Sequence, residues 1–503
     1  MNSAHSRLRL VRAGIDTYQQ PVVYMHRDCH VCRSEGFTAL TRVLARSGDR
    51  EVVATLNVVV DDHLELDVAA LSESAWTALR PGPEAWGAFS HPEPPASAPA
   101  LRAKVFGQRL GETDFLALMR DTVSNRLSDM ELTAFVTACA GERLDNQETI
   151  ALTKAMLAVG ERIDWCGGAV LDKHCVGGLP GNRTTPIVVA IVAAAGHRIP
   201  KTSSRAITSP AGTADAMEVM APVALDLEAM RRVVEREGGC IVWGGKVRLS
   251  PADDILIRIE RPLDFDSDGQ LVASVLSKKV AAGSTHVLID IPIGPTAKVR
   301  SSSAAALLEA RLLATAQALG LNLSVLRTDG LQPVGYGIGP ALEARDVLSV
   351  LRNEAAAPCD LRNRALDLAG ALLDAAPRAM PGEGRAMAST LLDNGTALRK
   401  FMAICEAQGG FTEPRIARHI RPVFANRTGQ IRQIDNRRLA KVAKLAGAPG
   451  SAIAGIDSRL RIGDGIKIGE PLFEVHARSP GELEYAFEYA SAHPDIFEIG
   501  AGQ

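Results

Sequence analysis

The chain has 503 residues, of which 46% are apolar, so it is long and apolar enough for several folded domains and is not a disordered chain. Its formal net charge is −2, and only 4% of its residues are aromatic. Nucleic-acid binding needs a concentrated basic face or stacking aromatic side chains, so we expect no nucleic-acid partner.

The chain shows no pattern typical of a membrane protein. The longest apolar run, Pro186–Gly196, is too short to cross a bilayer. Residues 1–20 contain no apolar stretch of signal-peptide length. We therefore expect a cytoplasmic protein without a membrane partner.

Residues 1–90 are predicted to form a small β-rich domain. Two apolar segments, 52–60 and 63–71, flank a pair of aspartates, and this pattern predicts a hairpin. In the same domain Cys29 and Cys32 form a Cys-x-x-Cys pair. One such pair is half a zinc site, and no second pair follows, so we favour a structural role over metal or redox use and predict no metal.

A linker and a helical domain come next. Residues 91–100 contain four prolines, which block both helix and sheet, and are predicted to be the linker. Residues 101–165 have apolar side chains at helical spacing. Two helix starts, "SDME" and "DNQE", place an acid three residues after a capping residue. The helical pattern returns at 255–284, which we expect to complete this domain.

The remaining residues are predicted to form an α/β domain and a small C-terminal domain. In 166–254 and 285–421, strands alternate with helices, which predicts a mostly parallel sheet with ligand loops at the carboxyl ends of its strands. Residues 422–503 mix helix and strand signals and are predicted to be a C-terminal α+β domain. The predicted fold class is thus multidomain α/β, with a β-rich N-terminal domain and a helical domain before the α/β domain.

Two loops of the α/β domain have the composition of anion sites. The first, "DKHCVGGLPGNRTT" (172–185), combines glycines, a lysine and paired threonines before an apolar helix. Glycines let backbone N–H groups approach an anion, and a helix N-terminus attracts negative charge. The second loop, 200–215, holds six hydroxyl side chains and two cations, which suits a second phosphate or the hydroxyls of a sugar.

Three alternating acids, Asp264, Asp266 and Asp268, precede the helical pattern near residue 270. Acids before a helix are usually caps and solvated charge, and this is the interpretation that we favour. The alternative is that one carboxyl is a general acid for a leaving group. Calcium is disfavoured, because the glutamate that ends an EF-hand loop is missing.

Four separated motifs resemble the thymidine phosphorylase and AMP phosphorylase family, the class II nucleoside phosphorylases. They are the first loop, "PKTSSRAITSPAGTADAMEV", "LVASVLSKKVAAGSTHVLIDIP" and "QPVGYGIGPALEARDVL", in this order. The form of the second loop and the extra N-terminal domain resemble the AMP phosphorylase branch most. The resemblance implies a pentosyltransferase that cleaves an N-glycosidic bond with inorganic phosphate, without a cofactor, and a homodimer or higher homo-oligomer.

The resemblance also implies roles for particular residues. Asp266 matches the proton donor of the AMP branch, and His174 is a second candidate for protonating the leaving base. The implied phosphate-binding residues are Lys173, Cys175, Thr185, Ser203 and Thr213. The implied nucleotide-binding residues are Gly178, Ser204, Arg205, Ala206, Ile207, Thr208, Ser209, Thr213, Ser274, Lys278 and Lys298.

Two departures from the family pattern bear on the substrate. Cys175 stands where the family commonly has serine, and a thiol is a weaker and longer donor than a hydroxyl. Ile257 stands where the thymidine enzymes have a tyrosine that grips the pyrimidine.

The leading hypothesis is phosphorolysis of a nucleoside 5′-monophosphate of the AMP, CMP or UMP type to free base and ribose 1,5-bisphosphate. The first alternative is a thymidine or pyrimidine-nucleoside phosphorylase, which gives the base and a (deoxy)ribose 1-phosphate. The second is a non-catalytic protein that senses phosphate or a nucleotide. A transferase that uses a pyrophosphorylated ribose is less favoured, because no acid pair suited to magnesium lies near the loops.

Overall fold

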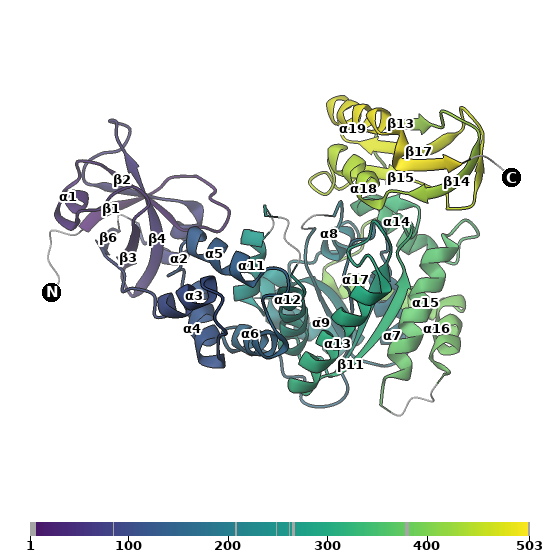
Figure 1. Cartoon of the computed structure of the whole chain (residues 1–503), viewed down its shortest axis with the longest axis horizontal. Coiled ribbons are helices and arrows are strands. Elements are labelled where there is room, and N and C mark those ends of the chain that lie inside the picture. Colours follow the sequence, from purple (N-terminus) through teal and green to yellow (C-terminus); the bar gives the residue numbers. More distant parts are fainter. Residues whose placement is uncertain are drawn as a thin grey trace. The chain divides into compact units, whose positions relative to one another are not determined.

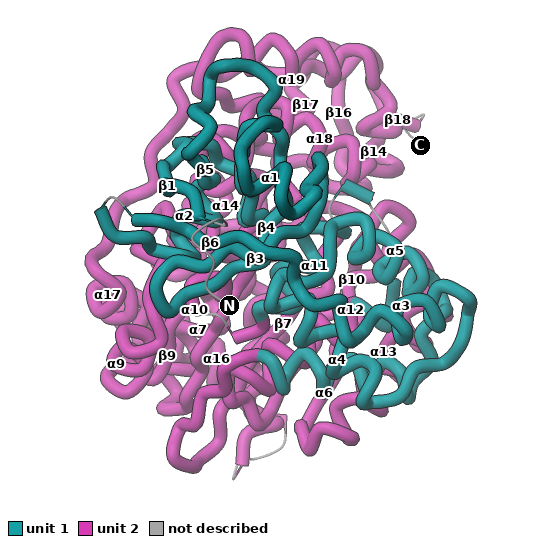
Figure 2. Tube along the Cα trace, turned by 90° about the vertical axis from the view of Figure 1, so that its left-hand side faces the viewer, with its two compact units in different colours: residues 1–159, 251–270 teal, residues 160–250, 271–503 magenta. Residues whose placement is uncertain are grey.

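The structure is a computed structural model, and it describes residues 7–83, 85–206, 209–247, 249–260, 262–263, 267–377 and 382–500. The chain divides into two compact units (Figure 2). Unit 1 comprises residues 1–159 and 251–270, and unit 2 comprises residues 160–250 and 271–503. Each unit is described by itself below.

Unit 1 begins with a closed β-barrel whose strand order is β1-β5-β2-β4-β3-β6. Its core is built from alternating apolar side chains of all six strands, together with the inner faces of two short helices. The elements are β1 (Arg7–Arg12), β2 (Val22–His26), α1 (His30–Glu35), β3 (Arg42–Ser47), β4 (Arg50–Val59), β5 (Val68–Leu71), α2 (Glu73–Leu79) and β6 (Trp86–Ser90).

The predicted hairpin between segments 52–60 and 63–71 is wrong. These segments contain β4 and β5, but β2 lies between them and pairs parallel with β4 and antiparallel with β5. A local turn signal does not reveal such a partner, because β2 comes from much earlier in the chain. In the closed barrel, β2 has a hydrogen-bonded neighbouring strand along each of its two edges.

The Cys-x-x-Cys pair belongs to the barrel core. Cys29 is the N-cap of α1, and its Sγ accepts a hydrogen bond of 3.2 Å from the backbone N–H of Cys32. The Cys32 thiol lies 3.8 Å from the sulfur of Met25, and both cysteines are buried. This packing agrees with the structural role that the sequence favours.

Helices follow the barrel in unit 1: α3 (Ala98–Val105), α4 (Glu112–Val123), α5 (Asp129–Cys139), α6 (Asn146–Ala158) and α11 (Pro251–Glu260). The two predicted helix starts are confirmed as capping boxes, with Ser128 paired to Glu131 and Asp145 paired to Glu148. Helix α3 begins inside the segment predicted as linker, and a proline lies in its first turn. A helix tolerates proline there, because the backbone N–H that proline lacks would have no partner within the helix.

The α/β part of unit 2 contains parallel strands, as predicted. Strands β11-β10-β7 form one parallel sheet, β8-β9 form another, and a bridge between Val170 and Arg198 joins β7 to β8. The strands are β7 (Leu171–Cys175), β8 (Ile199–Ser203), β9 (Gly239–Trp243), β10 (His286–Ile293) and β11 (Asn322–Asp329). Successive strands are connected through helices, which is the pattern of a parallel sheet.

The helices of this part are α7 (Thr185–Ala194), α8 (Thr213–Glu218), α9 (Leu227–Glu237), α10 (Gly244–Val247), α12 (Asp268–Ala281), α13 (Ser302–Ala318), α14 (Pro340–Leu351), α15 (Cys359–Asp374), α16 (Gly384–Asp393) and α17 (Thr396–Gln408). Helix α7 is rich in β-branched residues, yet it is helical, because all its residues from Thr185 to Ala193 are buried among its neighbours. Burial here outweighs the weak intrinsic helix propensity of β-branched residues.

Of the segment predicted to complete the helical domain, α11 lies in unit 1, whereas the residues of α12 from 271 onward belong to unit 2.

The C-terminal part of unit 2 is α+β, as predicted (Figure 1). The strand β12 (Gly337–Ile338) joins its larger sheet from earlier in the chain. Its other elements are β13 (His419–Phe424), β14 (Gly429–Ile434), α18 (Asn436–Leu445), β15 (Gly455–Asp457), β16 (Gly465–Ile466), β17 (Pro471–Ala477), α19 (Pro480–Ala492), a 3-10 turn (Pro494–Ile496) and β18 (Phe497–Gly500). Two antiparallel sheets and these two helices enclose one apolar core.

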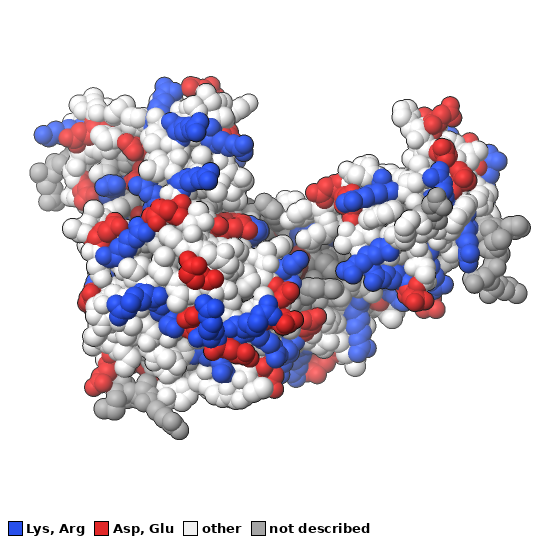
Figure 3. Space-filling view, turned by 180° about the vertical axis from the view of Figure 1, so that it is seen from behind, with Lys and Arg blue, Asp and Glu red and all other residues white. Residues whose placement is uncertain are grey.

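Among the described residues, no helix is both long and apolar enough to span a membrane. On the face drawn in Figure 3, lysines and arginines are interspersed with aspartates and glutamates instead of forming one continuous basic surface. This mixture corresponds to the net charge of −2.

Candidate functional site

The first loop connects β7 to α7, and its glycines are required by its shape. Gly177 and Gly178 have φ of 89° and 82°, in the left-handed region. A Cβ on Gly178 would lie 2.3 Å from the backbone N of Lys298, so this glycine lets the two segments touch. The fold thereby brings Gly178 and Lys298, both predicted to contact nucleotide, into direct contact.

Lys173 extends from β7 toward the start of α7. Its side chain is buried, its Nζ donates a hydrogen bond of 2.8 Å to Thr184 Oγ1, and Asp290 Oδ2 lies 3.9 Å from the same Nζ. Thr184 is the N-cap of α7 and Thr185 is its first residue. The predicted phosphate-binding residues Lys173 and Thr185 are therefore placed at one helix N-terminus, where backbone N–H groups have no helical partner.

Two further buried lysines stand beside Lys173. Lys279 Nζ donates a hydrogen bond of 2.7 Å to Asp172 Oδ2, and Lys201 Nζ lies 3.9 Å from Asp172 Oδ1. Burial lowers the pKa of Lys201 well below its ordinary value, and the neighbouring cations Lys279 and Lys173 lower it further. Burial thus favours the neutral amine of Lys201, and an anion bound nearby would favour its protonated form.

His174 follows Lys173 in β7 and is partly buried. Burial is the main cause that lowers its pKa well below the ordinary value, and the charges of Lys279, Lys201, Lys278 and Lys173 act in the same direction. The imidazole is therefore neutral at pH 7 and can donate one N–H. A neutral imidazole is a weaker proton donor than an imidazolium, so the electrostatics favour His174 as a hydrogen-bond donor.

Cys175 ends β7 and is partly buried. Asn182 Nδ2 lies 3.5 Å from its Sγ and donates to it. Burial raises the pKa of Cys175 to about 12, and the charge of Asp290 contributes to the shift. The group is thus a thiol at neutral pH, which donates weakly and does not react as a thiolate.

The second loop follows β8, which ends at Ser203. The Ser203 Oγ is buried and has no hydrogen-bond partner within the described residues. Asp215 Oδ2 accepts hydrogen bonds from the backbone N–H groups of Ala206 and Gly212, at 2.7 and 2.8 Å, and so closes the loop onto α8. Ile207 and Thr208, both predicted to contact nucleotide, lie outside the described residues.

The other predicted residues of the second loop differ in how many contacts their side chains make with the rest of the protein. Arg205 forms hydrogen bonds of 2.5 and 2.8 Å with Glu218 and lies 5.0 Å from the ring centre of Trp243. Ser204 is exposed, and Ser209 Oγ donates to the carbonyl of Ala211 at 3.0 Å. The Arg205 side chain is thus held by the protein itself, whereas Ser204 faces solvent.

The remaining predicted residues lie on or near α12. Ser274 and Lys278 are one helical turn apart on this helix and are partly buried, and the Lys278 charge acts on His174. Asp266, the predicted proton donor, lies outside the described residues.

Sequence reasoning missed Asp172, Lys279 and Asp290 as parts of this site, and it counted Lys201 only as one of the two cations of the second loop. All four occur inside the motifs quoted above, but nothing in a sequence says that a lysine or an aspartate is buried. It also missed Arg183 of the first loop and Glu343 of α14, whose ion pair is 2.6 Å long.

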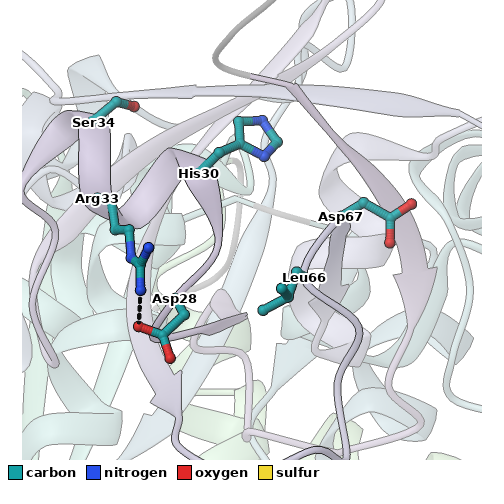
Figure 4. A pocket seen from close by; sticks show the side chains of 6 residues that line it. All are labelled: Asp28, His30, Arg33, Ser34, Leu66 and Asp67. Carbon is teal, nitrogen blue, oxygen red and sulfur yellow. Dashed lines mark hydrogen bonds and ion pairs between the residues drawn. The ribbon is translucent and has the colours of Figure 1, made fainter.

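The barrel of unit 1 has a surface cavity of its own, with a volume of about 620 Å³. Figure 4 shows Arg33 turned toward Asp28, with which it forms an ion pair of 2.6 Å. Cys29 and Cys32 do not line this cavity, because both are buried in the barrel core. In the described part of the chain, no three side chains of His, Cys, Asp or Glu are grouped so that they could hold a metal ion.

Two segments of the chain match one family of transferases. Residues 98–160 match the description "Glycosyl transferase family, helical bundle domain", and residues 167–398 match "Glycosyl transferase family, a/b domain". The anthranilate phosphoribosyltransferase of Thermus thermophilus superposes with a TM-score of 0.52 at 19% identity, over 61% of this chain and 99% of that chain. This likeness shows a shared fold.

Relatives along nearly the whole chain define the class more narrowly. A "Putative thymidine phosphorylase" of Polaromonas sp. is 61% identical, over 98% of this chain and 96% of the relative. Relatives with the same name include one of Hahella chejuensis, 56% identical over 98% and 97% of the two chains, and one of Legionella pneumophila, 54% identical over 98% and 95%. The chain belongs to the glycosyl transferase family and, within it, to the thymidine phosphorylase family of pentosyltransferase-class phosphorylases.

Proposed function

We propose that this protein catalyses phosphorolysis of a pyrimidine nucleoside of the thymidine or uridine type, giving the free base and a (deoxy)ribose 1-phosphate. The observation that carries the proposal is the buried Lys173 at the start of α7, with the buried Lys201 and Lys279 beside the adjacent Asp172. The relatives' names support the choice of a nucleoside as substrate.

In the proposed reaction, an oxygen of hydrogen phosphate attacks C1′ of the pentose while the bond from C1′ to the base nitrogen breaks. Lys173 and the N–H groups at the start of α7 hold the attacking anion and offset its desolvation. The base leaves with the bonding electron pair and takes up one proton. Protonation by Asp266, or a hydrogen bond from His174, stabilises the leaving base, and general acid catalysis of this kind contributes about 10²–10⁴-fold.

A second candidate is phosphorolysis of a nucleoside 5′-monophosphate, which would give ribose 1,5-bisphosphate. Two hydroxyls of the second loop favour it, because they could donate to a second phosphate: Ser204 is exposed, and Ser203 Oγ has no partner in the described part of the chain. We also propose a homodimer or higher homo-oligomer, which light scattering on the purified chain would test.

The experiment is a base-release panel of thymidine, uridine and the 5′-monophosphates of adenosine, cytidine and uridine, each with and without phosphate. We expect phosphate-dependent release from the pyrimidine nucleosides. Faster release from the monophosphates would instead support the second candidate. Phosphate binding without release from any substrate would contradict both and favour a phosphate-sensing protein.

Lys173→Met tests the role of the lysine cluster in the same panel. We expect a loss of at least about 10²-fold in kcat/KM, because the variant removes a charge placed against the attacking anion. Lys154→Met is the matched control, since Lys154 is exposed and forms a surface ion pair with Glu112. An unchanged kcat/KM in Lys173→Met would refute the proposed role.

A further inference from the structure

Arg183 of the first loop connects three segments of unit 2. Its Nη1 donates to Thr213 Oγ1 at 2.7 Å, and its Nη2 donates to the carbonyl of Ala211 at 3.0 Å. Its Nε donates to Glu343 Oε2 of α14 at 2.7 Å. The first loop, the second loop and α14 are therefore linked by one side chain, only 11% of which is exposed.

The bond to Thr213 has a fixed direction. A guanidinium only donates hydrogen bonds, so Thr213 Oγ1 must accept from Arg183. The hydroxyl hydrogen of Thr213 then points elsewhere and stays available to donate. A hydroxyl without such a neighbour can rotate and either donate or accept. The Thr213 hydroxyl is restricted to donating in any further hydrogen bond, and an anion needs a donor.

Glu343 in turn fixes the direction of Arg183. It is buried, its Oε2 accepts from Nε of Arg183 and lies 2.6 Å from Nη2 in an ion pair, and its Oε1 accepts from the backbone N–H of Gly339 at 3.1 Å. Since both oxygens of Glu343 accept hydrogen bonds, the carboxylate is fixed, and it holds the guanidinium of Arg183 in one orientation. A lysine could not replace it, since a single ammonium cannot reach three acceptors that are spread over a fork.

We propose that Arg183 is a positioning residue, which orients the Thr213 hydroxyl as a donor to the attacking phosphate and joins the two loops that bind it. The inference rests on the proposed function for the identity of the anion. Three of the five N–H groups of Arg183 donate to Glu343, Thr213 and Ala211, so in this scheme Arg183 is a link between protein groups and not itself a phosphate ligand. It acts on phosphate through Thr213.

The test is a double-mutant cycle between Arg183→Gln and Thr213→Val, with KM for phosphate and KM for nucleoside measured separately. Each single variant should raise the phosphate KM by about 10- to 100-fold, as expected for a lost hydrogen bond to a charged ligand, and change the nucleoside KM by less than about threefold. The double variant should be no worse than Thr213→Val, because both changes remove the same contact. Effects that multiply, or an unchanged phosphate KM, would overturn the proposal.

Arg352→Gln is the matched control. Arg352 caps the other end of α14 and forms an exposed two-bond ion pair with Glu413, at 2.8 Å for each bond. It should leave both KM values unchanged. If Arg183→Gln does not fold, Arg183→Lys takes its place, and an unchanged phosphate KM in that variant also overturns the inference.

Failure of the proposed function can be told from failure of this inference. If the wild-type protein releases no base from any nucleoside, the proposed function fails, and inorganic phosphate alone then serves as the probe. The phosphate concentration that gives a rise in Tm of the same size should be about 10-fold higher or more in Arg183→Gln than in wild type. Equal concentrations in the two proteins would overturn the positioning role.

Discussion

At the scale of single residues, we expect Cys175 to limit how well the first loop can donate to an anion. Its thiol is protonated, and its Sγ accepts from Asn182. Cys175→Ser supplies a shorter and stronger donor, so we expect the phosphate KM to fall by about 2- to 5-fold, the effect of one improved hydrogen bond. Steady-state kinetics at saturating nucleoside measure it. Cys166→Ser, at an exposed cysteine, is the control, and a phosphate KM that stays constant or rises in Cys175→Ser would contradict the expectation.

Asp346 is a second residue with a measurable signature, in the pH dependence of stability. Burial raises its pKa from 3.8 to about 7, although its Oδ2 accepts from the backbone N–H groups of Tyr336 and Gly337, at 2.7 Å each. Between pH 4 and 7 the folded protein therefore binds more protons here than the unfolded chain does. The free energy of unfolding should fall on this account by on the order of 2–4 kcal/mol as pH rises through that window.

Asp346→Asn isolates this contribution, because an amide does not titrate. Urea unfolding at pH 5 and at pH 7.5 should show a smaller decrease in the free energy of unfolding for the variant than for wild type. The same decrease in both proteins would show that Asp346 does not carry the pH dependence.

At the scale of elements, the contact between the first loop and the segment at Lys298 depends on Gly178. Gly178→Ala would place a Cβ 2.3 Å from a backbone nitrogen, and it would also keep an alanine at φ 82°. Gly177→Ala is a close control, since Gly177 has φ 89° but open space where its Cβ would stand. We expect Gly177→Ala to destabilise the protein by about 1–2 kcal/mol, and Gly178→Ala to cost at least about 1 kcal/mol more.

Chemical unfolding of the two variants measures this difference, and the phosphate KM shows whether the loop still binds. The KM should rise more in Gly178→Ala, since the backbone of the loop itself must move. Equal destabilisation by the two substitutions would mean that the close approach to Lys298 has no energetic importance.

At the scale of the whole molecule, both loops and the lysine cluster belong to unit 2, whereas the barrel belongs to unit 1. Phosphate binding should therefore slow amide hydrogen exchange in 172–185 and 200–215 but leave the barrel, residues 7–90, unchanged. Exchange followed by mass spectrometry, with and without phosphate, makes the comparison. Protection of the barrel alone would place the anion site elsewhere.

Local features were predictable, because their causes lie within a few residues of one another. The capping boxes of α5 and α6 each join a residue to one three positions later. The glycines of the first loop and its lysine stand in one short segment, so an anion site could be predicted there. The hairpin prediction was wrong because the partner of β4 and β5 is β2, which comes from a distant part of the chain.

The sequence by itself determined the fold class, the place of the two loops, and the family, since each depends on local chemistry or on motifs that are contiguous in the chain. Only the tertiary structure decided which charges are buried together. Asp172 meets Lys279, and Arg183 meets Glu343, across more than a hundred residues. Burying one charge alone is energetically costly, so a buried charge is paired with an opposite one. A sequence does not show which charges folding removes from water.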